Sequence, residues 1–473
     1  MKQDRRHYSL LILMTLAFLI RGGALFVNLD SFNADPDQYK ALARNLRTEG
    51  VYGSGTTPTA FRPPAYPAML AAISFATKQD RPVITDADAP SGVRFSLKLS
   101  PNGGIAFLHW VLGLLTVFLV FQIGRQLLFS PRLSALAGFL VAIDPILLQQ
   151  SRLAMTETAA TFFAVLIISS FIRIRHMKPS NRQRLAFFAV GILTGTAILC
   201  RPAFLLFAIL CFPILVIFEF QKKIAWVSPA IFLAGAAVVL LPWGVRNQRE
   251  LGRFTVTTTH GGYTLLLANN DFLYDDQRQL APLEGVWNPE KFHRFWNEKI
   301  QAALAEKGVE PGSVAAELLQ DDLASDEALG VMRVRKGDCA IATLWRIAHL
   351  WQPMPYQTDS AESQATRYAR TAVGVFYLAE LLLAAAGLGV LLVLACLHKS
   401  PYLPVDRSDW ILLVLLILSV QLPHLLYWTN MRMRAPVMPA VALLVILVLA
   451  RIFIFRRFQK IVTPEKAALS GRF

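Results

Sequence analysis

Ten apolar runs, each close to the roughly 20 residues that a helix needs to cross a bilayer, constrain this chain more than any other feature. Hydrophobic residues make up 54% and charged residues 17% of the 473 positions, whereas soluble domains contain about 25% charged residues. These values exclude an intrinsically disordered chain, and only 4 Cys argue against a disulfide scaffold. We expect a polytopic all-α membrane protein with about ten transmembrane helices. The runs cover residues 8–27, 104–124, 133–149, 154–172, 185–199, 203–219, 225–244, 371–397, 410–428 and 436–455.

Two features of these runs leave alternatives open. The short runs 185–199 and 203–219 flank Cys200-Arg201-Pro202 and could form two tight spans or one broken span. The first run follows a basic start and also fits a signal peptide, but no small-residue cleavage site follows it. We therefore expect an uncleaved membrane anchor.

Basic residues predict the orientation of the chain. With the N-terminus in the cytoplasm, the alternate loops and the C-terminal tail hold most of the Lys and Arg near the spans, as the positive-inside rule requires. An even number of spans then places both termini in the cytoplasm. This distribution accounts for much of the net charge of +15, so we expect the lipid bilayer as a partner and no nucleic acid. The residues concerned are Arg125, Arg132, Arg173, Arg175, Lys178, Arg182, Arg184, Lys222, Lys223, Lys399, Arg407, Arg456, Arg457 and Lys460.

Two long outer segments divide the chain into three predicted parts. Residues 1–244 form an N-terminal transmembrane module that includes the first outer loop, 28–103. Residues 245–370 form a small mixed α/β domain, and residues 371–473 form a C-terminal transmembrane module.

Within these segments, periodicity and length predict individual elements. In the first loop we expect a helix over 37–46, an interfacial helix over 64–77 and an insertion loop over 78–100. In the second segment we expect strands at 254–259 and 264–268, a helix that begins near Pro289, and another from about 311 to 351.

Five polar clusters lie at the predicted outer face. They contain Asp35 and Asp37, Arg62, Glu157, Arg201, and the pair Arg432 and Arg434. Helix capping is the alternative for the acids, and chance exceptions to the charge rule are the alternative for the outer arginines. Carboxylates can act as bases or bind metals, and guanidiniums can bind phosphate, so the combination suits group transfer from a lipid-linked phosphate donor. The chain has no Gly-rich phosphate loop, HExxH, paired CxxC or GxSxG motif.

A series of motifs in this order resembles the bacterial GT-C superfamily of polyprenyl-phosphate-sugar-dependent glycosyltransferases, relatives of the protein O-mannosyltransferases and the lipid A aminoarabinose transferase. The motifs are Asp35-x-x-x-Tyr39-x-x-x-Ala43-x-x-Leu46, Arg62-Pro63-Pro64-x-Tyr66-Pro67, Leu128-Phe129-Ser130 with Arg132, Ser151-x-x-x-x-Thr156-Glu157, Arg201-Pro202, Pro242-Trp243-x-x-Arg246-Asn247 with Gly252-x-Phe254, Gly261-Gly262 with Asn269-Asn270, and Arg432-x-Arg434-x-Pro436.

This resemblance implies a multi-pass enzyme of the bacterial inner membrane, with a periplasmic active site and an inverting transfer of a sugar from a polyprenyl-phosphate donor to a lipid, glycan or protein acceptor. It implies that Asp35 is the catalytic base, with Asp37 as the nearby rival, and that Glu157 orients the acceptor or a metal ion. The cofactor stays unknown: the sequence does not decide whether a divalent ion is used, and Asp35 and Glu157 are the candidate ligands for one. Candidate substrate-binding residues are Tyr39, Arg62, Tyr66, Arg201, His260, Arg432 and Arg434.

Two departures and two rival functions qualify this hypothesis. The insertion 78–100 is longer than usual, and His260 stands where many relatives have Asn, as a ligand, a base or a turn residue. The first rival is an O-antigen polymerase or ligase, which would use Arg and His of the large outer segment. The second is a secondary transporter or lipid flippase, which would place polar groups near the bilayer midplane, where Asp144 is the main candidate.

Overall fold

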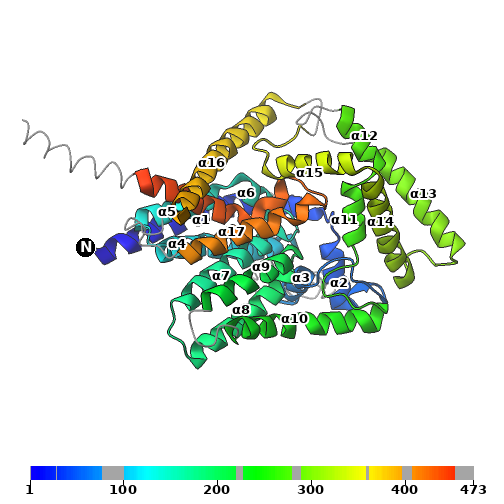
Figure 1. Cartoon of the computed structure of the whole chain (residues 1–473), viewed down its shortest axis with the longest axis horizontal. Helices are drawn as coiled ribbons and strands as arrows, with labels where there is room; N and C mark the ends of the chain where they lie inside the picture. Colours follow the sequence, from blue (N-terminus) through cyan, green and yellow to red (C-terminus); the bar gives the residue numbers. More distant parts are fainter. Residues whose placement is uncertain are drawn as a thin grey trace, which may run out of the picture.

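A computed structural model describes residues 2–27, 29–76, 101–219, 227–279, 289–357, 362–396 and 407–452 (Figure 1). The described chain is almost entirely helical. Its sheet consists of two short antiparallel strands, β1 (Gly53–Ser54) and β2 (Thr57–Pro58). The predicted insertion loop 78–100, the basic residues Lys222, Lys223 and Lys399, and the basic tail lie outside the described residues.

Helices form over all ten predicted apolar runs. Six of the described helices are long and apolar enough to cross a membrane, and a seventh span results if α5 and α6, which meet at a 51° bend, count as one. The multi-pass architecture is therefore confirmed, whereas ten crossings stay a prediction. The helices are α1 (Lys2–Phe26), α4 (Pro101–Gln126), α5 (Pro131–Ile143), α6 (Pro145–Ser151), α7 (Glu157–Arg175), α8 (Asn181–Ile198), α9 (Ala203–Glu219), α10 (Val227–Leu251), α16 (Gln364–Cys396), α17 (Arg407–Gln421) and a last helix that follows η4 (Met431–Val437) within Met431–Ile452.

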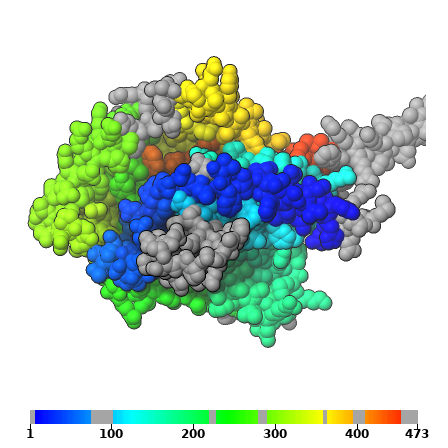
Figure 2. All heavy atoms as spheres, turned by 180° about the vertical axis from the view of Figure 1, so that it is seen from behind, coloured from blue at the N-terminus to red at the C-terminus, as the bar shows by residue number. Residues whose placement is uncertain are grey.

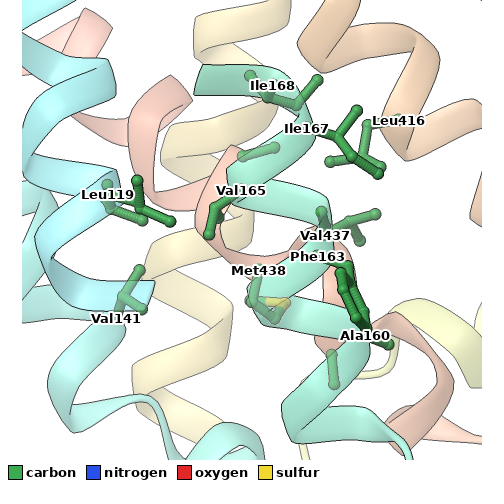
Figure 3. Packing of buried hydrophobic residues seen from close by; sticks show 14 of the residues in the cluster. Leu119, Val141, Ala160, Phe163, Val165, Ile167, Ile168, Leu416, Val437 and Met438 are labelled. Atoms are coloured by element: carbon green, nitrogen blue, oxygen red, sulfur yellow. The ribbon is translucent and has the colours of Figure 1, made fainter. Parts of the chain in front are cut away.

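Helix α7 lies at the centre of the bundle. Figure 3 shows its apolar side chains packed between α4 and α5 on one side and α17 and the last helix on the other. A helix of 19 residues is about 28 Å long, so Glu157 and Arg175 lie at opposite ends of the apolar layer. The core therefore fixes where the first residue of α7 is presented. The labelled core residues are Leu119, Val141, Ala160, Phe163, Val165, Ile167, Ile168, Leu416, Val437 and Met438.

The basic loops meet at the Arg175 end of α7. Arg175 and His176 lie 2.7 and 3.2 Å from the carboxylate of Asp409 near the start of α17. The ring of Phe129, in the α4–α5 loop, lies 6.0 Å from that of Trp410. Arg125 and Arg132, which flank this loop at the ends of α4 and α5, therefore lie at the same end. This arrangement agrees with the predicted sidedness, and which compartment this end faces stays a prediction.

Helix α1 lies along the outside of the bundle, as Figure 2 shows in dark blue. Many of its large apolar side chains are exposed, including Leu11, Ile12 and Leu19. An exposed apolar helix face of this kind suits contact with lipid.

Five helices form the outer segment at the opposite end of the bundle from the N-terminus (Figure 1). Four of them, α11 to α14, share a second apolar core around Leu266, Phe292 and Trp296. The helices are α11 (Gly261–Ala268), α12 (Asp271–Gln279), α13 (Glu290–Glu306), α14 (Val314–Val334) and α15 (Lys336–Trp351).

The predicted strands at 254–259 and 264–268 are wrong. Residues 261–268 form α11, residues 254–259 have no regular structure, and the described part of the segment is helical rather than mixed α/β. Gly262 allows α11 to contact α14, because a Cβ there would lie 2.0 Å from the carbonyl oxygen of Asp321. The Asp321 carboxylate also accepts a hydrogen bond from the Gly262 N–H. Tertiary packing thus favours a helix where the local pattern of residues 264–268 predicted a strand.

The other elements of the outer segments follow the predictions more closely. The first loop contains η1 (Leu29–Asn33), α2 (Tyr39–Thr48) and α3 (Ala65–Ala76), and α2 begins two residues late because Gln38 is left-handed, with φ 61°. Helix α13 begins directly after Pro289, as expected. The single helix predicted over 311–351 is two helices, α14 and α15. They separate at Arg335, which is paired with Asp271, Asp275 and Asp338.

Two glycines allow α8 and α10 to cross closely. A Cβ at Gly191 would lie 2.1 Å from the carbonyl oxygen of Phe232, and one at Gly235 would lie 2.2 Å from that of Phe188. Small residues at helix crossings allow membrane helices to approach in this way. The contact depends on backbone atoms, which cannot move aside like a flexible side chain.

We predict that Gly191→Ala destabilises the bundle by about 1–3 kcal/mol, the usual cost of overpacking. Thermal unfolding of the purified protein in detergent would measure it. Gly389→Ala in α16 is the matched control, because no atom lies within 4 Å of a Cβ placed there. Equal unfolding midpoints for the two variants would contradict the close crossing.

Candidate functional site

Five charged side chains from separate segments of the chain meet at the outer end of the bundle. Arg62 donates a hydrogen bond of 2.7 Å to Asp37. Arg432 lies between two acids, with its Nη2 at 3.9 Å from Asp37 and its Nε at 3.8 Å from Glu157. Arg201 Nη1 lies 3.4 Å from the same Glu157 oxygen. We call Asp37, Arg62, Glu157, Arg201 and Arg432 the charge cluster.

The ends of helices position the members of the charge cluster. Glu157 is the first residue of α7, and Arg201 lies in the turn between α8 and α9. Arg432 lies in η4, whose start is capped by Asn430, because the side-chain oxygen of Asn430 accepts from the Arg432 N–H. The sulfur atoms of Met155 and Met433 contact the guanidinium groups of Arg432 and Arg201 at 3.0 and 2.7 Å.

The charge cluster has unused capacity for hydrogen bonds. Glu157 is only 2% exposed, and its Oε2 has no hydrogen-bond partner. Arg201 Nη1 and Arg432 Nε are buried without hydrogen bonds, although both are close enough to Glu157 for ion pairing. Three cations against two carboxylates leave an excess of one positive charge. Buried polar atoms normally find partners, so this arrangement suits an anionic ligand with a hydroxyl group beside it.

Asp35 faces a different direction from Asp37. Its two carboxylate oxygens accept hydrogen bonds from the backbone N–H groups of Lys40 and Ala41, at 3.1 and 3.0 Å. These are donors of the first turn of α2, which would otherwise lack partners. The geometry is therefore that of the helix cap that we gave as the alternative for Asp35.

The two candidate tyrosines pack against each other, and Tyr39 lies beside Arg62 of the charge cluster. Their rings are 5.3 Å apart and perpendicular, and Arg62 lies 5.9 Å from the ring of Tyr39. Burial raises the pKa of Tyr39 above its usual range. The hydroxyl of Tyr66 is 2.8 Å from His109 Nε2, and His109 Nδ1 is 2.7 Å from the carbonyl oxygen of Ser151. Tyr66 is fully buried, so its described contacts are with Tyr39 and His109 rather than with solvent.

His260 lies beside Arg62 in an aromatic stack. Its ring centroid lies 4.1 Å from that of Phe61 and 5.3 Å from that of Tyr263. Burial, with a smaller effect from the nearby Arg62 charge, lowers the pKa of His260 to about 3. The ring is therefore neutral at physiological pH, and it cannot provide a positive charge for a phosphate.

The structure does not bring Arg434 to the charge cluster. Its side chain is 0% exposed, and it donates to the carbonyl oxygens of Leu350 and Gln352 at 3.0 and 2.7 Å. The guanidinium also lies 4.5 Å from the centre of the Tyr377 ring. Arg432 and Arg434 belong to one sequence motif and were both predicted to bind substrate, but they have different surroundings.

The residues do not fit a divalent ion between Asp35 and Glu157. Both oxygens of Asp35 are bonded to backbone N–H groups, and the environment of Glu157 consists of two guanidiniums, which disfavour a second cation. Across the described ranges, no group of three or more His, Cys, Asp and Glu side chains could hold a metal ion.

The sequence analysis missed Glu317, which joins the two outer segments next to the charge cluster. Its carboxylate accepts from the hydroxyls of Thr59 and Thr259 and from the Ala60 N–H. Arg246 supports the same segment by donating to the carbonyl oxygens of Tyr52 and Thr59. Glu317 is one of several acids on α14, and no local sequence pattern distinguishes it from the others.

We predict that Glu317→Ala loosens the segment that leads to Arg62. Hydrogen bonds to a charged group contribute about 1.5–3 kcal/mol each, so amide hydrogen exchange at residues 58–62 should accelerate by about 10- to 100-fold. Exchange measured by mass spectrometry would test this. Asp326→Ala, an exposed acid on the same helix, is the control. Unchanged exchange in the Glu317 variant would show that this carboxylate does not hold the segment.

Comparison with known proteins supports the resemblance that the motifs indicated. Residues 91–257, about a third of the chain, match the family described as dolichyl-phosphate-mannose-protein mannosyltransferase. A search of curated proteins finds no significant match.

Solved structures show the same fold. The archaeal oligosaccharyltransferase AglB from Archaeoglobus fulgidus, in complex with an inhibitory peptide and a dolichol-phosphate, is 15% identical with a TM-score of 0.52; the alignment covers 97% of this chain and 52% of AglB. The Archaeoglobus fulgidus oligosaccharyltransferase tethered to an acceptor peptide is 16% identical, with a TM-score of 0.51 and coverage of 94% and 50%.

ArnT from Cupriavidus metallidurans, bound to undecaprenyl phosphate, is 14% identical with coverage of 93% and 77%, and its TM-score of 0.40 is too low to support an argument. The chain spans about half the length of the AglB structures that it matches. Residues 91–257 are therefore similar to the dolichyl-phosphate-mannose-protein mannosyltransferase family, and the chain shares its fold with the archaeal oligosaccharyltransferase.

Proposed function

We propose that this protein transfers a sugar from a polyprenyl-phosphate donor to an acceptor hydroxyl at the outer face of the membrane. The observation that carries the proposal is the charge cluster, in which Arg432 lies between the carboxylates of Asp37 and Glu157. The description of the matched family names dolichyl-phosphate-mannose, and the structure of AglB was solved in complex with a dolichol-phosphate. Both observations support a lipid phosphate as the ligand of this cluster.

The proposed reaction is a single displacement at the anomeric carbon. The acceptor oxygen attacks this carbon, and the bond between the carbon and the phosphate oxygen breaks. The electron pair of that bond leaves with the polyprenyl phosphate, and the proton of the acceptor hydroxyl moves to a carboxylate. Attack from the side opposite the phosphate inverts the anomeric centre. The chain's part is to hold the phosphate, orient the hydroxyl and take the proton.

We assign the phosphate to Arg201 and Arg432. Each has a buried N–H group without a hydrogen bond, and both face Glu157. A phosphate that binds here would fill these free positions and balance the excess positive charge. As the donor bond breaks, negative charge grows on the phosphate, so the same two cations stabilise the transition state more than the ground state.

We assign the base to Asp37 rather than Asp35, which the resemblance implied. Asp37 Oδ1 accepts from Arg62, and its Oδ2 is directed to Arg432, next to the proposed phosphate position. Asp35 instead uses both oxygens to cap α2. Glu157 Oε2, which has no partner, would accept a hydrogen bond from a second polar group of the acceptor and so orient it, while the reacting hydroxyl gives its one proton to Asp37.

The location of the site is part of the proposal. The basic loops meet at the Arg175 end of α7, and the charge cluster lies at the Glu157 end. By the positive-inside rule, the cluster would face the periplasm of a bacterial inner membrane, with both termini in the cytoplasm.

The rival functions receive less support from the described residues. Arg346, an outer-segment arginine that a ligase could use, is buried and donates to the carbonyl oxygens of Ala268 and Leu425. Asp144, the candidate midplane acid of a transporter, caps α6 through the Leu147 N–H and accepts from the Tyr377 hydroxyl. Both groups thus have structural roles.

We predict that Asp37→Asn lowers transfer by about 10²–10⁴-fold, the usual contribution of a general base. Asp35→Asn is the matched control. The Asp35→Asn side chain keeps one acceptor oxygen for the helix cap. This variant should therefore lose about 1 kcal/mol of stability and retain most of its transfer activity. Mass spectrometry of envelope glycans and lipids, in a deletion strain complemented with each variant, would measure the product. Loss of product with Asp35→Asn and not with Asp37→Asn would return the role of base to Asp35.

We predict that Arg432→Lys weakens donor use by about 10- to 100-fold, because Lys is a point charge that cannot give two parallel hydrogen bonds to a phosphate. Arg434→Lys keeps a cation that can donate to the carbonyl oxygens of Leu350 and Gln352, so η4 should stay in place. This variant should lower thermal stability and leave the KM for the donor unchanged in the folded fraction. Steady-state kinetics with a polyprenyl-phosphate sugar, at matched amounts of folded protein, would separate the two. A raised donor KM only in the Arg434 variant would exclude Arg432 as the phosphate ligand.

A further inference from the structure

His260, at the N-terminal end of α11, has a fixed ring with unused nitrogen atoms. The ring contacts those of Phe61 and Tyr263, with 4.1 and 5.3 Å between centroids. The side chain does not cap α11, and no other described residue gives either ring nitrogen a hydrogen bond or takes one from it. The ring is partly rather than fully buried. A polar side chain that is held by its neighbours and lacks a polar partner is suited to bind a ligand.

Paired segments hold His260 beside Arg62 of the charge cluster. The Thr259 N–H donates to the Ala60 carbonyl oxygen at 3.1 Å. Glu317 accepts from the Thr259 hydroxyl and from the Ala60 N–H. The same carboxylate therefore positions both the segment that carries Arg62 and the residue before His260.

Helix α11 also contacts the segment that carries Arg432. The N–H of Trp428, four residues before Arg432, donates to the carbonyl oxygen of Thr264 at 3.2 Å. Arg62 and Arg432 are the two arginines that pair with Asp37. The start of α11 is therefore attached to both segments that flank the proposed base, on the side of the cluster where the acceptor would bind.

The charge balance at this place favours a neutral ligand. Three cations and two carboxylates leave one positive charge in the charge cluster, and the phosphodiester of the proposed donor would neutralise it. Burial lowers the pKa of His260 to about 3, so the imidazole adds no charge at physiological pH. An anion bound beside this ring would have no counterion. A neutral imidazole instead offers one donor and one acceptor of hydrogen bonds, which suits hydroxyl groups.

The number of polar groups around the base favours a sugar over a peptide. The reacting hydroxyl gives its proton to Asp37, and Glu157 Oε2 and the His260 ring remain for other polar groups of the acceptor. A Ser or Thr side chain has only one hydroxyl. A sugar ring carries several hydroxyls on neighbouring carbons, so it can bond to all three side chains at once.

We propose that His260 binds the acceptor, and that the acceptor is a neutral sugar whose neighbouring hydroxyl groups bond to the imidazole. Such sugars occur in glycolipids and in soluble glycans, and the chemistry of recognition is the same in both. This inference rests on the proposed transfer reaction and adds the class of acceptor to it.

Transfer assays with the purified full chain test the proposal. The donor is the radiolabelled polyprenyl-phosphate sugar fraction of the wild-type cells. The acceptors are the glycolipid, soluble glycan and delipidated protein fractions of the envelope of a deletion strain. Label should enter the glycolipid or the soluble glycan fraction, which identifies the source of the sugar. Periodate, which cleaves between carbons that carry neighbouring hydroxyls, should remove the acceptor activity of that fraction.

The variant His260→Phe keeps a ring in contact with Phe61 and Tyr263 and removes both nitrogens. Its KM for the accepting fraction should rise about 10-fold, the effect of losing one or two neutral hydrogen bonds. Its KM for the donor and its slow transfer of sugar to water should not change, which also shows that the variant is folded. His260→Asn, which keeps a donor and an acceptor, should recover part of the loss. His293→Phe is the matched control, because it removes another imidazole of the same aromatic group.

Several results would overturn the proposal. An acceptor KM that is unchanged in His260→Phe, or raised equally in His293→Phe, would exclude His260 as a ligand of the acceptor. A rise only in the donor KM would assign the imidazole to the donor. Label that enters only the protein fraction would make the acceptor a peptide. If wild-type protein released sugar neither to an acceptor nor to water, the proposed transfer reaction itself would be wrong.

Discussion

The site depends on the buried guanidinium of Arg434. An arginine inside a membrane bundle is expensive unless its charge has partners. Here Arg434 donates to the carbonyl oxygens at the end of α15, lies over the ring of Tyr377 in α16, and through that tyrosine is linked to Asp144 at the bend between α5 and α6. These contacts fix η4 against three other elements. Arg432, two residues earlier in η4, extends its side chain to Asp37 and Glu157 of the charge cluster. The contacts of Arg434 therefore fix the backbone of η4, and this backbone positions Arg432 in the charge cluster.

Much of the helical framework could be predicted from the sequence, because the thickness of the bilayer sets the length of an apolar run that spans it. The ten runs, the helix at α2 and the apolar helix α3 are present. The predictions failed where tertiary contacts decide the local structure. Residues 264–268 are helical because Gly262 allows α11 to pack on α14. The predicted helix 311–351 breaks at Arg335, which pairs with three acids. Asp338 is close to Arg335 in the sequence, whereas Asp271 and Asp275 belong to α12.

The grouping of the site could be predicted better than the roles of its residues. The sidedness of the spans placed Asp37, Arg62, Glu157, Arg201 and Arg432 on one side, and the structure brings them into contact. Sequence could not tell Asp35 from Asp37 or Arg432 from Arg434, because residues two apart point in different directions only once the turn or 3₁₀ helix is formed. No sequence pattern indicated the role of Glu317, because its partners Thr59 and Thr259 are 258 and 58 residues away. Long-range hydrogen bonds of this kind leave no local pattern.

The central claim is that the charge cluster holds the phosphate of a lipid-linked donor. The most direct measurement is a structure, by electron cryo-microscopy in nanodiscs, of this protein with a polyprenyl phosphate. The account predicts phosphate density within hydrogen-bonding distance of both Arg201 and Arg432, with Arg434 still bonded to the carbonyl oxygens of Leu350 and Gln352. Phosphate bound at Arg434, or on a surface away from Glu157 with the cluster unchanged, would contradict it.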